Sequence, residues 1–223
     1  MKKDREILQE LLEMDTTKVE TLQLAMEKNP FLEEREKEVF KGMLTFFQKY
    51  PMDSYRTCIK KACLLKIKRK YARSSNSLME TDRTEIKSWI SKDHSLYLDV
   101  LKHEFVHSLN PNLPFIYQNE FNEGLTNLIM MDTYHIPITQ IHYMHLTIFM
   151  MMMSRIYGFK KWVQTYQGLY TYHIINEMEQ VLGREDLKYL QVATGFVNEV
   201  EYVKKAILDE ALDWGYLSDE HQS

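Results

Sequence analysis

The chain has 223 residues, of which 44% are hydrophobic and 27% charged, and its formal net charge at pH 7 is −4. This length and composition are those of one folded domain, or of one domain built from two lobes, and they exclude a disordered chain with too little apolar material to bury. The acidic balance argues against a dedicated nucleic-acid-binding protein, because no overall positive field would attract a phosphate backbone.

The scarcity of turn-forming residues favours long helices. With 7 Gly and 5 Pro in the whole chain, too few turns are available for a sandwich or a barrel. We therefore predict an α+β protein that is mostly helical. Its segments are an N-terminal helical segment (1–50), a core (51–136) and a helical C-terminal lobe (137–223), all packed as one compact unit.

Apolar residues recur at helical spacing twice in the first fifty residues, from Ile7 to Leu12 and from Val39 to Phe47. Further along, alternating residues predict two short strands, Leu65–Tyr71 and Glu85–Ile90, with a turn at 73–77 between them. The chain after Pro137 again reads as several packed helices. Glycines follow their apolar stretches as expected of C-terminal caps, at Gly158, Gly168, Gly183, Gly195 and Gly215.

Neither secretion nor membrane insertion is indicated. The N-terminus lacks the apolar stretch of a secretory signal, and the Met-rich run Leu146–Met153 is far shorter than the roughly 20 residues that cross a bilayer. We expect that run to fill core, since Met adapts to irregular gaps. Cys58 and Cys63 lack the spacing of a zinc ribbon and are expected to be free thiols. The expected location is therefore cytoplasmic, with no membrane partner.

Residues 60–73 carry seven Lys and Arg and no acidic residue. Such a run is usually a solvated face, and contact with an acidic peptide is the functional alternative. No ladder of interleaved aromatic residues supports binding to nucleic acid.

The segment His103-Glu104-Phe105-Val106-His107 has the pattern HExxH. On a helix, residues four apart lie about 40° apart around the axis, so both imidazoles project from one face within reach of a single ion. Leu98, Leu101, Phe105 and Leu109 gather on the opposite side. The helix predicted from about 95 to 109 therefore has a ligand face and a core face.

A second helical pattern, Asn122 to Ile129, carries an acidic residue sixteen positions after His107. A catalytic Zn²⁺ site uses three protein ligands and one open position, and two His with one Glu is a standard set. Glu123 is therefore the predicted third ligand, although an acid near a helix N-terminus is also favoured by the helix dipole alone. Asn127, one turn further, is a candidate to hold a ligating imidazole by its second nitrogen.

The segments His103–His107 and Asn122–Thr126 together resemble the gluzincin group of zinc metallopeptidases, and the resemblance covers roughly residues 64–135. It implies a zincin-like fold with a small mixed sheet, an active-site helix and a helical C-terminal lobe. Metzincins are excluded, because Asn110 and Leu113 stand where that group needs Gly and His or Asp. The spacer before Glu123 is shorter than in the thermolysin-like and M1 aminopeptidase families, and the M1 motif Gly-x-Met-x-Asn is absent, so no substrate is carried over.

The resemblance implies peptide-bond hydrolysis, in which Zn²⁺ activates a water and Glu104 acts as general base. Gluzincins generally take a downstream Tyr or His to stabilise the oxyanion. The stretches 132–135 and 142–145 both offer candidates, and Tyr143 is preferred, a core tyrosine being the alternative. The expected substrate is a peptide or a selected cytoplasmic protein, cleaved internally. The other hypothesis is a catalytically latent zinc-binding protein with a regulatory or interaction role, against which the intact Glu104 argues.

Overall fold

The computed structural model describes residues 2–70, 78–82, 84–110, 118–141 and 143–167. The chain divides into two compact units, Met1–Pro111 and Asn112–Ser223. This boundary falls inside the segment 51–136 that the sequence suggested as the core. The predicted turn at 73–77, His142 and the glycines from Gly168 onward lie outside the described residues.

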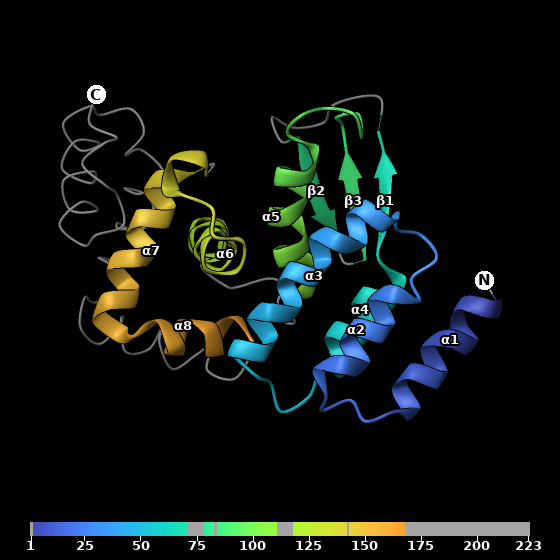
Figure 1. Cartoon of the computed structure of the whole chain (residues 1–223). Coiled ribbons are helices and arrows are strands. Elements are labelled where there is room, and N and C mark those ends of the chain that lie inside the picture. Colours follow the sequence, from blue (N-terminus) through green and yellow to red (C-terminus); the bar gives the residue numbers. More distant parts are fainter. Residues whose placement is uncertain (1, 71–77, 83, 111–117, 142, 168–223) are drawn as a thin grey trace. The chain divides into compact units, whose positions relative to one another are not determined.

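Helices predominate in the described part of the chain, and a small sheet accompanies them (Figure 1). The predicted α+β, mostly helical class is therefore confirmed. The helices of the first unit are α1 (Lys2–Glu13), α2 (Val19–Glu27), α3 (Glu34–Lys49), α4 (Arg56–Leu64) and α5 (Tyr97–Leu109). Those of the second unit are α6 (Gln118–Tyr134), the 3₁₀ turn η1 (Ile138–Gln140), α7 (Met144–Tyr157) and α8 (Phe159–Tyr166).

The sheet has three strands, β1 (Lys66–Arg69), β2 (Met79–Asp82) and β3 (Glu85–Ser88), in the order β1-β3-β2. The two strands that the sequence predicted, β1 and β3, pair in parallel, whereas β2 was not predicted and pairs with β3 antiparallel. Ile86 on the central strand is fully buried and lies between Ile67 and Thr81. The sheet is therefore mixed, with β2 next to α5.

The core of the first unit is built from the apolar faces of its helices. The ring of Phe40 on α3 meets the ring of Phe105 on α5 edge to face, with centroids 5.8 Å apart. Phe47 contacts Tyr55 in the same way at 5.5 Å. The first contact connects the predicted stripe at 39–47 with the back of the HExxH helix, and the second connects it with the start of α4.

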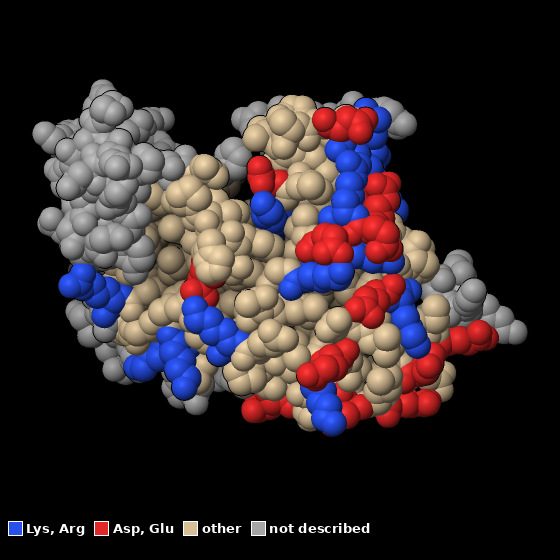
Figure 2. Space-filling view, in the orientation of Figure 1, with Lys and Arg blue, Asp and Glu red and all other residues tan. Residues whose placement is uncertain are grey.

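Several lysines of the basic run have partners in the described part of the chain. Lys66 lies over the ring of Phe31, 4.1 Å from its centroid, and Lys68 and Lys70 pair with Glu85 at 2.5 Å and 3.8 Å. Figure 2 shows basic and acidic side chains interspersed over the sheet and the neighbouring helices. The run therefore does not produce a field of one sign on this face.

In the second unit, α6 and α7 cross closely and α8 packs on α7. Met150, Met151 and Met153 are buried in this unit, as expected of a run that fills core, whereas Met152 is exposed. None of the helices in the described ranges is long and apolar enough to cross a membrane.

Candidate metal centre

The HExxH segment lies in α5, and its apolar back orients the two histidines. Leu101, Phe105 and Leu109 recur at intervals of four residues and are fully buried. Burying this stripe fixes the rotation of the helix about its axis, since any other rotation would expose it to water. His103 then lies half-buried on the other side, with His107 buried one turn later.

A buried carboxylate holds the first turn of α5. The hydroxyl of Tyr97 donates to Glu36 Oε1 at 2.7 Å, and Glu36 is fully buried on α3. The same carboxylate accepts the backbone N–H of Glu33 at 2.8 Å and pairs with Lys92 at 3.2 Å. Burial, together with the hydrogen bond to Glu36, raises the pKa of Tyr97, so that its hydroxyl remains a donor.

Two side chains of α4 bind the carbonyls at the other end of α5. The Cys58 thiol donates to the Leu109 carbonyl at 3.4 Å, and the Lys61 ammonium donates to the Asn110 carbonyl. These are carbonyls that a helix leaves without partners in its last turn. Burial raises the pKa of Cys58 to about 12, so this thiol is a structural donor and not a nucleophile. Burial lowers the pKa of Lys61.

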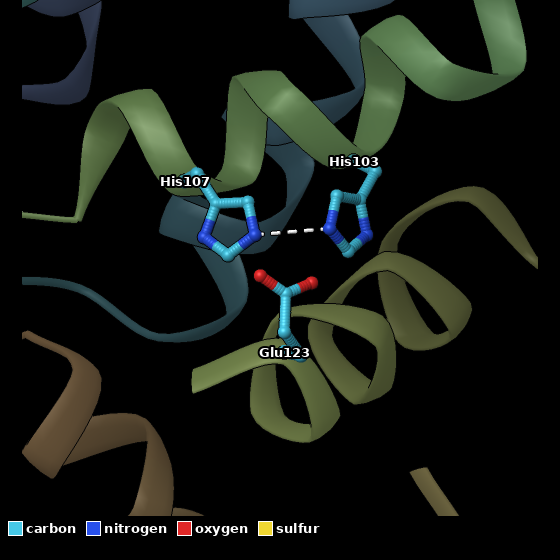
Figure 3. A group of neighbouring side chains, drawn as sticks. All are labelled: His103, His107 and Glu123. Atoms are coloured by element: carbon cyan, nitrogen blue, oxygen red, sulfur yellow. Dashed lines mark hydrogen bonds between the residues drawn. The ribbon is translucent and has the colours of Figure 1, made fainter. Parts of the chain in front are cut away.

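The imidazoles of His103 and His107 face each other. Their Nε2 atoms are 2.9 Å apart, and the ring centroids lie 4.6 Å apart with the planes at 76° (Figure 3). A neutral imidazole has one donor and one acceptor nitrogen. One ring must therefore donate from Nε2 unless a cation lies between the two.

Glu123 lies on α6, half-buried, at the position predicted for the third ligand. One ligand atom each from His103, His107 and Glu123 lies within 4.8 Å of the others, so this group could hold a metal ion (Figure 3). Two nitrogens, each at 2.0–2.1 Å from a tetrahedral ion, would be roughly 3.3 Å apart. The observed 2.9 Å between the Nε2 atoms is close to that value. The two imidazoles therefore have a spacing suited to one metal ion of this coordination type.

Glu104 occupies the position between the two histidines and is 7% exposed. Its carboxylate Oε2 accepts a hydrogen bond from the Thr81 hydroxyl on β2, and its backbone carbonyl lies 3.2 Å from the same hydroxyl. Sequence reasoning missed Thr81. A threonine two residues after the buried Met79, on the side of the strand that faces the core, was the available signal.

The remaining predicted residues have these positions. Asn127 is fully buried on α6. Tyr143 is 48% exposed and forms the N-cap of α7 in the left-handed region, with φ 58°. The nearby His145 is buried, and this burial lowers its pKa. A role at the metal centre for Asn127 or Tyr143 remains a prediction.

Comparison with protein-family models, with curated proteins and with solved structures gives no match for this chain.

Proposed function

We propose that this chain is a zinc-dependent metallopeptidase of zincin-like architecture, with Zn²⁺ held by His103, His107 and Glu123. The observation that carries the proposal is the approach of the two Nε2 atoms to 2.9 Å on a helix that also carries Glu104. Either imidazole alone would be an ordinary side chain of a largely buried helix. Their convergence, with a carboxylate in the same group, makes a chelating set.

The donor types favour zinc. Two imidazole nitrogens and one carboxylate oxygen match the three-ligand set of catalytic zinc sites, which leave a fourth position open. A site for Ca²⁺ or Mg²⁺ would be built mainly from oxygen ligands.

When bound, zinc supplies Lewis-acid polarisation of a carbonyl and lowers the pKa of a coordinated water. The chain itself contributes a general base, the Glu104 carboxylate, next to a proposed zinc ligand. Glu104 follows His103 directly, so its carboxylate is positioned to take a proton from the attacking water and then to deliver it to the leaving amine. Its burial, at 7% exposure, excludes bulk solvent that would compete for the same proton.

The sheet supports an extended peptide as the substrate. Strand β2 has a partner on one side only in the described sheet, and α5 is its neighbour. An outer strand has backbone donors and acceptors on its unpaired side that can pair with an extended chain. A peptide bound there would lie along the strand whose Thr81 contacts Glu104.

The test compares wild type with Glu104→Gln in the presence of zinc, using a peptide library analysed by mass spectrometry. Wild type should cleave peptides and lose this activity with a chelator. Glu104→Gln should keep about one zinc per chain and lose roughly 10²- to 10⁴-fold in turnover, the usual contribution of a general base.

The control is His103→Ala, which should lose both the zinc and the activity. Full activity in Glu104→Gln would overturn the mechanism. A wild-type protein that binds zinc but cleaves nothing would instead favour the latent, regulatory role.

A further inference from the structure

We propose that Thr81 is a positioning residue that orients the Glu104 carboxylate for proton transfer. This inference rests on the proposed function. It is based on a contact between two elements of the first unit: the Thr81 hydroxyl, on β2, hydrogen-bonds Glu104 Oε2, on α5.

Thr81 places a hydroxyl on the face of β2 that also carries the buried Met79. Along β2, Met79 is buried, Glu80 and Asp82 are exposed on the other face, and Thr81 is half-buried. Side chains alternate between faces, so Thr81 shares the face of Met79, and its register partner Ile86 is fully buried. An apolar residue is the usual occupant of such a position.

The hydroxyl has two acceptors within reach and one proton to donate. The Glu104 carbonyl, at 3.2 Å, is a main-chain oxygen inside α5, where helical hydrogen bonding already uses it. A carboxylate oxygen is the stronger acceptor, because hydrogen bonds to charged groups are about twice as strong as neutral ones. We therefore assign the Thr81 proton to Oε2.

With Oε2 bonded to Thr81, the second oxygen of the Glu104 carboxylate is left to accept the proton of the attacking water. In the described part of the chain, Thr81 is the side chain that hydrogen-bonds this carboxylate. A glutamate has three rotatable side-chain bonds, and fixing one oxygen selects among its rotamers. Misplacing a reacting group by about 1 Å can reduce a rate by roughly a hundredfold.

The experiment compares three variants of the full chain loaded with zinc: Thr81→Val, which keeps the shape, Thr81→Ser, which keeps the hydroxyl, and Thr84→Val as a control in the same hairpin. The substrate is the library peptide that wild type cleaves fastest. Thr81→Val should lower kcat about tenfold or more, with KM and zinc affinity essentially unchanged. Thr81→Ser should restore most of kcat, and Thr84→Val should behave as wild type.

A second measurement needs no activity. In the metal-free protein, the melting temperatures of Thr81→Val, Glu104→Met and the double variant form a double-mutant cycle. The effects should be non-additive, since either single change already removes the hydrogen bond. Additive effects would show that the bond is absent in solution and would overturn the inference.

The failures of the two proposals are distinguishable. If wild type cleaves peptides and Thr81→Val keeps the full kcat, the positioning role is wrong and the proposed function stands. If wild type with bound zinc cleaves nothing, the proposed function fails, and the role of Thr81 in it fails as well.

Discussion

A fully buried carboxylate is expensive to keep charged unless several donors surround it, and Glu36 has three. They are the Tyr97 hydroxyl, the Lys92 ammonium and the Glu33 backbone N–H. The bond from Tyr97 connects α3 to the first residue of α5. The position of the HExxH helix therefore depends on a polar residue that is distant in sequence from the motif.

Tyr97→Phe should lower the free energy of unfolding by about 1–3 kcal/mol, the cost of leaving a buried acceptor short of a donor. Chemical denaturation gives this value directly. The matched background is Glu36→Gln, whose side chain is neutral and costs less to leave unpaired, so the same Tyr97→Phe change should cost less there. Equal costs in both backgrounds would show that Tyr97 contributes through packing alone.

In the second unit, α6 lies close against α7 at Gly124. A Cβ at Gly124 would lie 2.4 Å from the Leu146 carbonyl oxygen and 2.6 Å from Met150 Cγ. The methionine could rotate away, but the carbonyl is part of α7, so the two helices would have to separate. Because Gly124 follows Glu123, any separation also displaces the proposed ligand.

Gly124→Ala should therefore destabilise the protein by about 1–2 kcal/mol. Overpacking typically costs 1–3 kcal/mol, and the gain in helix propensity from Gly to Ala returns up to about 1 kcal/mol. Zinc affinity, measured by competition with a chelating dye, should fall as well.

The control for this variant is Gly158→Ala at the end of α7. Gly158 has φ +87° with nothing within 4 Å of the added Cβ. That change should cost stability through backbone strain and leave zinc affinity unaltered. An unchanged affinity in Gly124→Ala would contradict the link between helix packing and the ligand.

Across the chain, the elements with strong hydrophobic periodicity were predictable from the sequence. The helices in 1–50, the HExxH helix and the helix with Glu123 follow from apolar spacing. Strand β2 was missed, because Met79–Asp82 carries two acids and one β-branched residue and is a strand only through its pairing with β3. Strand pairing depends on tertiary contacts, which the local β-propensity of a segment does not predict.

The candidate site likewise contains some features that the sequence predicts and others that it does not. The spacing of His103 and His107 is set by helix geometry alone, so their convergence could be predicted. The hydrogen bond from Thr81 joins residues 23 positions apart in sequence, and the Tyr97–Glu36 bond joins residues 61 apart. Such contacts depend on how the helices and strands pack, and no local sequence pattern predicts them.

Zinc removal tests the proposed site through stability. A ligand that binds the native state alone stabilises it by mass action, by about 2.7 kcal/mol when free zinc exceeds its dissociation constant a hundredfold. Differential scanning calorimetry should show a higher melting temperature with zinc and a lower one with chelator. The metal-free protein should remain folded, because the first unit has its own apolar core around Phe40, Phe47 and Phe105.

His103→Ala should abolish the zinc-dependent shift in melting temperature, whereas His94→Ala, at an exposed histidine outside the group, should keep it. Complete unfolding in chelator would mean that the ion is structural, as in a zinc finger, and identical melting of wild type with and without zinc would mean that no metal binds there.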